Sequence, residues 1–557
     1  MPHGNRKKRD EMQVPNIAAD GCTIKLLSGR GKSILHVLIE GEAPLPVHCG
    51  GLGICGNCRI LFGGEPGPPL TTVEKRHLVK EEIRAGVRLA CQVKPKNGRQ
   101  IRIIKPPSIT KWRTIDEQEL PLMPFPNMAT GKFPGAGRYG LSIDLGTTHI
   151  RAALWDLAKQ VRLAGKSCLN PHNRFGADIL QRLDASVRSA GSEHRMKQLM
   201  AGIVSELVED LRSDGHLQNG IIGSVVVVGN TAMLTLLAGN NQGLLLNPLN
   251  WTREIDVQPQ CPDRLKSAMG IPCEASLHLV PAIAGFIGSD LPAAIIYTGM
   301  CRDARRTLLI DFGTNSEIAF WDGESLWVTS AAGGPAFDGC GISCGMPAAP
   351  GAISRIQKGT DGSTFACDVI GNDDPKGICG SGIVDAIALL LEGGALRPSG
   401  KFNPGFHMRG FRFQFKKRDM VLKPIDVDVF QRAKAAIAAG VSTVLHQAMI
   451  DPGDIERIHV CGAFGRHLSL VNAKAVGLLP DLTDDRFVIS GNAALGGCER
   501  LLTAEHRQFL IDDIRDRVRT VDLARSTFFA DAFAAHLFLR AAGFGIEQQH
   551  FHQKSKE

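Results

Sequence analysis

The chain has 557 residues, 43% of them hydrophobic, and at roughly 100 to 200 residues per domain this length predicts three or more domains. The net charge is +8, from 64 lysines and arginines against 56 aspartates and glutamates. The densest basic run, Arg6 to Arg9, falls in a polar N-terminal segment, and a short solvated tail does not indicate nucleic-acid binding. Composition therefore favours a multidomain globular protein without a nucleic-acid partner.

Hydropathy and cysteine usage indicate the compartment. No stretch approaches the roughly 18 uninterrupted apolar residues of a membrane span, and the N-terminus lacks the apolar core of a secretion signal. The sequence therefore predicts a soluble, cytoplasmic protein with no membrane partner. The 15 cysteines fit that compartment, because a reducing cytosol keeps thiols free for metal or redox chemistry instead of disulfides.

The first predicted elements form a compact α+β pattern over residues 21–105, after a basic tail at 1–20 that we expect to be disordered. Periodicity and turn residues predict two strands, one apolar helix and one charged helix in this unit. The strands are expected at 22–27 and 99–104, the apolar helix at 32–41 and the charged helix at 72–86. This is a β-grasp-like arrangement.

Between these elements, residues 47–58 read VHCGGLGICGNC and space Cys49, Cys55 and Cys58 as C-x5-C-x2-C; a fourth cysteine, Cys91, follows the charged helix. Plant-type ferredoxins hold a 2Fe-2S cluster with three cysteines spaced C-x4-C-x2-C in one loop and a distant fourth. The loop here has one residue more between the first two cysteines, a spacing that resembles that of ferredoxins of the adrenodoxin type. The loop glycines allow positive φ angles and let backbone N–H groups approach sulfur.

Two other interpretations of the cysteine loop compete with the cluster. A zinc site usually has two Cys-x2-Cys-like hooks, and Cys91 has no second cysteine nearby. A thioredoxin-like pair at Cys55 and Cys58 requires a βαβ setting and leaves the other two cysteines unexplained. The sequence therefore favours a 2Fe-2S cluster.

Residues 106–138 are rich in proline and lack periodicity, which predicts an extended, semi-rigid linker. Beyond it the chain alternates strand, tight turn and helix, with a weak internal repeat. LSIDLGTTHIRAALWD (141–156) and LLIDFGTNSEIAFWD (308–322) each contain an apolar strand, the string Asp-x-Gly-Thr and a second strand that ends in Trp-Asp. A single repeat over this separation suggests two related halves facing one another, since solenoid repeats recur every 20 to 50 residues.

The two Asp-x-Gly-Thr turns have the chemistry of phosphate sites. Each glycine lets the backbone approach a phosphate, and the threonine hydroxyl and N–H groups can donate to its oxygens. The aspartates suit Mg²⁺, which takes one or two carboxylates together with water and phosphate oxygens. Five further Gly-rich turns are each expected to join a strand or loop to a helix, a geometry that favours anion binding; they lie at 225–233, 331–339, 377–387, 458–468 and 490–497.

The order of the two Asp-x-Gly-Thr turns, a later CGAFG and a closing GNAAL resembles the ASKHA superfamily, in which two ribonuclease-H-like halves close on ATP. With the cysteine loop and the strings NPHNRFGADILQRL, AAGGPAFDGCGISCGM, GICGSGIVDAI and QRAKAAIAAGV, the chain resembles the RACo family, the reductive activators of corrinoid proteins, over residues 22–545. No 4Fe-4S motif follows Cys498, unlike in related activators for methylamine corrinoid proteins. The stretch between the phosphate turns is also shorter than expected of the family.

The resemblance implies a fold and a set of site residues. The fold is a β-grasp 2Fe-2S ferredoxin domain, the linker, and a duplicated α/β ASKHA domain with halves at 139–304 and 305–547, before a polar tail at 548–557. The site residues fall into four groups: cluster ligands Cys49, Cys55, Cys58 and Cys91; the first phosphate turn, Asp144, Gly146, Thr147 and Thr148; the second, Asp311, Gly313, Thr314 and Asn315; and an adenosine-side turn, Gly462, Ala463, Phe464 and Gly465.

The resemblance also implies a function. The protein would use ATP with Mg²⁺ to pass one electron from the cluster to Co(II) of a corrinoid protein in a methyltransferase system, after taking it from an upstream donor. Asp144 and Asp311 would organise Mg²⁺ and nucleotide as the catalytic pair, while hinge closure of the halves grips the partner and the tethered cluster domain delivers the electron. The alternatives are an ASKHA small-molecule kinase or a dehydratase activator with a fused ferredoxin domain, and a plain 2Fe-2S electron carrier. A homodimer is left open.

Overall fold

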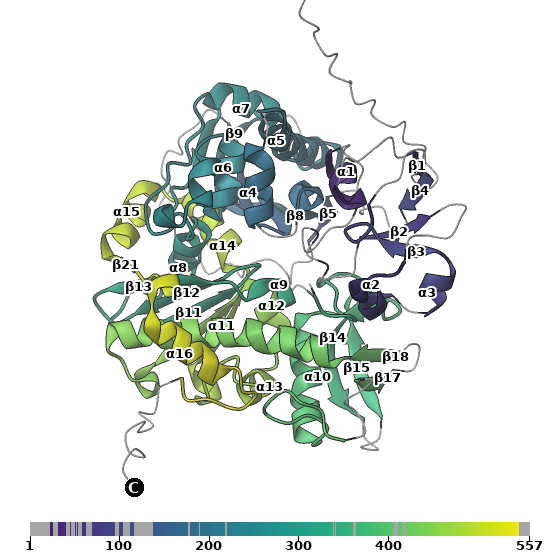
Figure 1. The fold of residues 1–557 in the computed structure, drawn as a ribbon. Coiled ribbons are helices and arrows are strands. Elements are labelled where there is room, and N and C mark those ends of the chain that lie inside the picture. The colour runs from purple at the N-terminus through teal and green to yellow at the C-terminus, as the bar shows by residue number, and fades with distance from the viewer. Residues whose placement is uncertain are drawn as a thin grey trace, which may run out of the picture. The chain divides into compact units, whose positions relative to one another are not determined.

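The chain forms two compact units in the computed structural model, residues 1–109 with 173–177 and residues 110–172 with 178–557. Each unit is described by itself (Figure 1). The predicted tails at 1–20 and 548–557 lie outside the described residues. The structure describes residues 23–25, 32–40, 45, 51, 53, 58–62, 69–78, 80–94, 100–103, 112–115, 137–176, 179–188, 190–217, 220–337, 339, 341–359, 364–404, 410–415 and 419–544.

The first unit contains a four-stranded sheet with strand order β1-β4-β2-β3, in which every neighbouring pair is antiparallel. Apolar side chains of these strands and of α1 form its core, among them Leu35, Ile60 and Ile101. The strands predicted at both ends of the unit and the apolar helix are confirmed. The elements are β1 (Thr23–Lys25), α1 (Ile34–Glu40), β2 (Arg59–Phe62), α2 (Thr72–His77), α3 (Lys80–Arg84), β3 (Val87–Leu89) and β4 (Gln100–Ile103).

The charged helix predicted at 72–86 is instead two short helices, α2 and α3, with a break at Leu78. Thr71 and Glu74 form a capping box at the start of α2, and the Glu74 carboxylate is fixed by two bonds from the buried Arg88 guanidinium, at 2.8 and 2.7 Å. Leu78 has extended backbone angles, and its side chain is buried in the core. Because burial of this leucine takes the chain out of helical geometry, periodicity alone could not locate the break.

The second unit contains two six-stranded sheets with the same arrangement of their five main strands. The first has the order β10-β9-β6-β7-β8-β5 and the second β20-β19-β11-β12-β13-β21. In both, the hairpin that carries the Asp-x-Gly-Thr turn is antiparallel to the third strand and parallel to the fourth. Two related halves are therefore confirmed. The strands are β5 (Arg113–Thr114), β6 (Tyr139–Leu145), β7 (His149–Asp156), β8 (Val161–Leu169), β9 (Ile222–Gly229), β10 (Ser276–Leu279), β11 (Thr307–Phe312), β12 (Ser316–Trp321), β13 (Leu326–Ala331), β19 (Arg457–Cys461), β20 (Phe487–Gly491) and β21 (Val518–Thr520).

Helices and two small sheets complete the second unit, and α16 packs along α11 (Figure 1). None of the helices in the described residues has the length and apolar character needed to cross a membrane. The first half contains α4 (Ile179–Val187), α5 (Ala190–Ser213), α6 (Thr231–Ala238), α7 (Pro262–Ala268) and α8 (Asp290–Thr298). The second half contains α9 (Gly334–Phe337), β14 (Ala352–Lys358), β15 (Phe365–Val369), β16 (Gly377–Ile378), α10 (Gly380–Glu392), β17 (Phe411–Gln414), β18 (Asp419–Leu422), α11 (Pro424–Ala448), α12 (Gly462–His467), α13 (Leu470–Ala475), α14 (Ala493–Thr503), α15 (Arg507–Arg517) and α16 (Thr527–His536).

Helix α14 connects the two halves. It follows β20 of the second sheet, yet it packs on α8 and on β6 and β9 of the first sheet. The Cys498 thiol donates to the main-chain oxygens of Ile143 and Val226, and the buried Glu499 carboxylate accepts from Trp155 and Arg162 of the first sheet. The second half is thereby anchored on the first at this helix.

The linker predicted at 106–138 is not irregular throughout. Strand β5 pairs antiparallel with β8, and the next residue, Ile115, is buried and donates its N–H to Gly165 at 2.9 Å. The prediction of an extended segment did not include this pairing, because a four-residue segment is too short to show periodicity. Residues 106–111 and 116–136 of the linker lie outside the described residues.

Candidate functional site

The two Asp-x-Gly-Thr turns lie against each other across the halves of the second unit. The first turn joins β6 to β7 and the second joins β11 to β12. The hydroxyl groups of Thr148 and Thr314 are 2.9 Å apart, although 166 positions separate them in sequence. The structure thus brings the two predicted phosphate turns together.

The two threonines of the first turn have different surroundings. The Thr147 hydroxyl accepts a hydrogen bond from the Asn230 amide at 2.8 Å, and its main-chain oxygen accepts one from the buried Arg182 at 2.7 Å. Thr147 is therefore held inside the first half, by the residue that caps α6. Thr148, by contrast, contacts Thr314 of the second turn, a distinction between the two threonines that the sequence alone does not give.

Four carboxyl groups gather beside these turns: Asp144 and Glu317, which are buried, and Asp290 and Asp311, which are half-buried. Burial raises the pKa of Asp144 to about 6. Burial, and then repulsion by the other carboxylates, raises the pKa of Asp311 to about 7, that of Asp290 to about 7 and that of Glu317 well above its ordinary value. A cluster of this charge favours a bound cation.

Arg151 supplies positive charge to the cluster and lowers the pKa of both Asp144 and Asp311. It lies directly opposite Asp144 in the first hairpin, whereas Glu317 lies opposite Asp311 in the second. The two hairpins thus place opposite charges at the same position of the sheet. Among the described side chains, no three His, Cys, Asp or Glu residues are arranged to hold a metal on their own.

Sequence reasoning missed Asp290 and Glu317. Glu317 could have been found, because it lies on the second strand of the hairpin, directly after the second turn, where a side chain can share a face with Asp311. Asp290 gives no comparable signal. It is the first residue of α8, which begins beside the end of β9, where the Ser289 N–H donates to the Gly229 oxygen at 2.9 Å; Gly229 in turn pairs with Leu145, next to the first turn.

The predicted adenosine-side turn, between β19 and α12, lies against the second phosphate turn. Gly462 has a φ of +86°, and a Cβ at this position would come within 2.9 Å of the Asp311 carboxylate and 2.5 Å of the Phe312 oxygen. Only glycine leaves that space open. The Phe464 ring packs against Phe312 at a centroid distance of 5.1 Å.

The remaining predicted residues of the nucleotide site lie in the same region. Gly465 is buried in α12, and the Asn315 oxygen accepts the Gly313 N–H at 3.1 Å inside the second turn. The Gly146 oxygen accepts a bond from the Asn170 amide at 2.8 Å. Ala463 belongs to α12, but its side chain is outside the described residues.

Asn492, the capping residue of α14, also reaches this cluster. Its side-chain oxygen accepts the Leu495 N–H at 3.2 Å, and its proximity lowers the pKa of Asp144. The closing GNAAL string therefore contributes a polar group from the second half to the aspartate of the first half. All five further Gly-rich turns lead from a strand into a helix, as predicted.

Of the four predicted cluster ligands, the structure describes Cys58 and Cys91. Their segments are adjacent, because β2 and β3 are paired and the Ala90 N–H donates to the Cys58 oxygen at 2.8 Å. The Gln92 amide donates to the Cys91 sulfur at 3.4 Å, and Gly51, with a φ of +96°, lies against Cys91. This donor chemistry fits a thiolate-ligated cluster. Cys49 and Cys55 lie outside the described residues.

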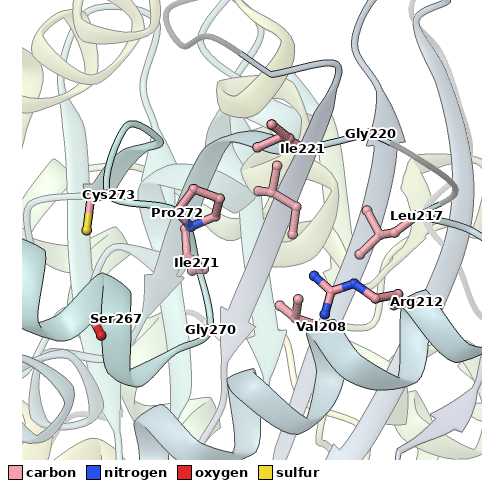
Figure 2. A pocket seen from close by; sticks show the side chains of 11 residues that line it. Val208, Arg212, Leu217, Gly220, Ile221, Ser267, Gly270, Ile271, Pro272 and Cys273 are labelled. Carbon is pink, nitrogen blue, oxygen red and sulfur yellow. The ribbon is translucent and has the colours of Figure 1, made fainter.

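A separate cavity of about 390 Å³ lies in the first half (Figure 2). It is an open pocket lined by the end of α5, the segment that enters β9 and the loop after α7, and its lining includes Arg212, Ile221, Pro272 and Cys273. The phosphate turns meet the opposite end of β9. At about 3.3 Å per residue, this eight-residue strand separates the two places by roughly 23 Å. The cavity is therefore not part of the candidate nucleotide site.

The family of the chain follows from comparison with known protein families. The model described as the RACo middle region matches residues 139–303, and the one described as the C-terminal domain of RACo, the ASKHA domain, matches residues 305–549. The chain belongs to the RACo family. A 2Fe-2S iron-sulfur cluster binding domain matches residues 17–96, so the predicted fold class of a RACo protein, with a ferredoxin domain before an ASKHA domain, is confirmed.

Individual proteins resemble this RACo chain over most of its length. Corrinoid activation enzyme RamQ of Eubacterium limosum is 29% identical over 424 residues, which cover 71% of this chain and 69% of RamQ. The Co(II) methylated amine-specific corrinoid protein reductase of Methanosarcina barkeri is 24% identical over 448 residues, 73% of this chain and 78% of the reductase. A solved structure, the reductive activator for corrinoid,iron-sulfur protein, has a TM-score of 0.65 at 23% identity, covers 93% of this chain and 96% of its own, and supports the fold.

Proposed function

We propose that this protein is an ATP-dependent reductive activator that passes one electron from a 2Fe-2S cluster to the Co(II) of a corrinoid protein and so regenerates Co(I). The observation that carries the proposal is the combination, in one RACo-family chain, of paired cysteine segments with two facing phosphate turns. The names of the two relatives, an activation enzyme and a Co(II) corrinoid protein reductase, favour this function over a kinase, a dehydratase activator or a plain carrier.

The residues of the second unit are suited to bind ATP with Mg²⁺. Asp144 and Asp311 would hold the metal, directly or through water, and Arg151 would face the phosphates, because it is the cation that acts on both aspartates. Thr148 and Thr314 would donate to phosphate oxygens. Their hydroxyls, 2.9 Å apart, leave no room for a phosphate between them, so nucleotide entry requires the halves to separate. This supports a hinge that opens and closes with the nucleotide.

In the first unit, Cys58 and Cys91, together with Cys49 and Cys55, would hold the cluster, which supplies a one-electron donor near roughly −400 mV. The Co(II) of a corrinoid is harder to reduce, and for one electron each 59 mV of deficit corresponds to about 1.4 kcal/mol. Nucleotide binding or hydrolysis can drive the step only if it favours one conformation over another. A reducing cytoplasm, which keeps the four thiols available, is the setting we propose.

The test is an anaerobic reduction assay. The protein, reduced with Ti(III) or dithionite, is mixed with a Co(II) corrinoid protein, with and without Mg-ATP, and the Co(I) absorption band is followed. We expect ATP-dependent Co(I) formation by the wild type. Asp144→Ala and Asp311→Ala should reduce their cluster normally and form no ATP-dependent Co(I), because the lost carboxylates organise the metal and not the electron donor.

Two results would contradict the proposal. One is the absence of an ATP-dependent Co(I) band with every corrinoid protein tried, including those of methylamine and corrinoid iron-sulfur systems. The other is full ATP-dependent activity in both aspartate variants, which would mean that these carboxylates do not organise the nucleotide. The matched control is Asp531→Ala, an exposed aspartate on α16, which should behave as the wild type.

A further inference from the structure

A four-residue segment of the linker, Trp112 to Ile115, is fastened to the first half of the ASKHA domain. The Trp112 indole N–H donates to the main-chain oxygen of Ile203 on α5 at 2.9 Å. Arg113 and Thr114 pair with β8, and Ile115, 4% exposed, donates its N–H to Gly165. We refer to these four residues as the clip.

The side chains of β8 are more deeply buried in the part of the strand that the clip covers. Residues 161–164 of this strand are exposed or half-buried, whereas residues 165–168 are buried. Lys166, in the covered part, is 4% exposed and forms ion pairs with Asp210 and Asp214 of the α5 region. The clip thus lies over both β8 and α5, which Lys166 already connects.

The covered end of β8 leads directly to the first phosphate turn. The residue after the strand, Asn170, donates from its side chain to the Gly146 oxygen at 2.8 Å and from its backbone to the Thr148 oxygen at 2.9 Å. Arg113 of the clip is close enough to His149, at the other end of the same turn, to help lower the pKa of that histidine, after burial and Arg151. The clip therefore contacts the strand that supports the nucleotide site.

The clip also shortens the connection to the ferredoxin domain. Between the end of β4 at Ile103 and the clip at Trp112 there are eight residues, 104–111, a length of chain that spans at most about 30 Å. Without the clip, the next described residue is Gly137, and the covalent connection would consist of residues 104–136, about four times as many. Because the effective concentration of a tethered group falls as roughly the −3/2 power of tether length, that change corresponds to about an eightfold loss.

We infer that Trp112 and Ile115 are positioning residues: they fix, beside the nucleotide site, the point at which the tether of the ferredoxin domain begins. We refer to this tethered, electron-donating domain as the arm. This inference rests on the proposed function, in which the cluster domain must reach a corrinoid protein. The arm does not move on the whole linker predicted from the sequence; it moves from the edge of the first ASKHA sheet on a short tether. The clip thereby raises the local concentration of the electron donor without touching nucleotide, cluster or substrate.

The test opens the clip in the full-length, cluster-loaded protein with the double variant Trp112→Ala/Ile115→Ala. At saturating corrinoid protein, the kcat for ATP-dependent Co(I) formation should fall about eightfold, while the KM for the corrinoid protein, ATP hydrolysis and reduction of the cluster by dithionite stay at wild-type values. Trp112→Phe, which keeps an aromatic ring but lacks the N–H donor, should show a smaller decrease in kcat. The matched control is Phe509→Ala, which removes an aromatic ring that is 68% exposed on α15 and should change none of these quantities.

A second measurement reports directly on the clip. Trypsin should cleave after Arg113 much faster in the double variant than in the wild type, because pairing with β8 protects that bond. Faster cleavage together with an unchanged kcat overturns the inference, as does an equal loss of ATP hydrolysis, which would make the clip a structural support only. The absence of ATP-dependent Co(I) in the wild type instead contradicts the proposed function, and the two failures are thereby distinguishable.

Discussion

In the candidate nucleotide site, clustered carboxyl groups lower the stability of the fold but are suited to bind a cation. Asp144 and Asp311 could be found from the sequence because their Asp-x-Gly-Thr setting is local. Asp290 could not, since it comes to them only through the packing of α8, and Asn492 reaches Asp144 only because α14 crosses between the halves. Four buried or half-buried carboxyl groups at one place repel one another in the absence of a cation, and such a cluster of raised pKa values is typical of a functional site.

The first prediction concerns pH and Asp290. A carboxyl group whose pKa is higher in the folded than in the unfolded protein binds its proton more tightly when folded, so the folded state loses stability as pH rises from about 4 through about 7. Asp290→Asn removes one charge and lessens the repulsion on Asp311 and Glu317. In thermal melts without nucleotide, the variant should exceed the wild type in melting temperature at about pH 8, and the difference should shrink toward zero as the pH falls below about 4.

Mg²⁺ with a non-hydrolysable ATP analogue should show the complementary pattern. Because metal ligands must be deprotonated, its stabilisation of the wild type should grow between about pH 6 and pH 8 and be smaller in Asp290→Asn. The control is Glu392→Gln, which changes an exposed carboxylate that pairs with Lys358 on the surface. It should leave both profiles unchanged. Identical pH profiles for wild type and Asp290→Asn would show that the carboxyl groups do not interact.

At the level of single elements, the sequence predicted the strands and helices well where a repeated pattern or a Gly-rich turn marked them. Both hairpins with Asp-x-Gly-Thr turns and all five strand-to-helix turns are present. The failures are of two kinds. The helix at 72–86 breaks at Leu78 because tertiary burial overrides local helical preference, and β5 was missed because its pairing partner, β8, lies more than fifty residues further along the chain.

The second prediction concerns the contact between α8 and α14. A Cβ on Gly497 would stand 1.8 Å from the Ala293 oxygen, so Gly497→Ala must force the helices apart. Overpacking of this kind costs about 1 to 3 kcal/mol. We expect a lower free energy of unfolding for the second unit and weaker nucleotide binding, since α14 also positions Asn492 next to Asp144. Denaturant unfolding and nucleotide titration measure the two effects.

The control for this prediction is the same substitution in an open part of a helix. Gly202 lies inside α5, and a Cβ there has no neighbour within 4 Å. Gly202→Ala should therefore stabilise the protein by about 0.5 to 1 kcal/mol through the lower backbone entropy of alanine in the unfolded chain. Equal stability of the two alanine variants would mean that α8 and α14 do not approach each other this closely.

For the whole molecule, composition and motif order gave the domain sequence and the family, because a cysteine loop and two phosphate turns are local patterns with a fixed order. They did not predict that the clip within the linker docks on the first half. They also did not predict that α14 of the second half packs on the first sheet. Both features arise from contacts between residues far apart in sequence, such as Trp112 with Ile203 and Glu499 with Arg162. The same contacts tie both halves of the ASKHA domain and the start of its linker into one compact unit.

The third prediction follows from this division into two units with separate cores. In calorimetry of the full chain we expect two transitions, since units with their own cores unfold independently when few contacts join them. Removal of iron by anaerobic chelation should lower the temperature of one transition only, that of the first unit. Mg²⁺ with a non-hydrolysable ATP analogue should raise the temperature of the other transition only. At a hundredfold excess over Kd, the free energy of unfolding of the second unit should increase by about 2.7 kcal/mol. A single transition shifted by both treatments would show that the two units unfold together, and that the cluster domain is not an independently moving arm.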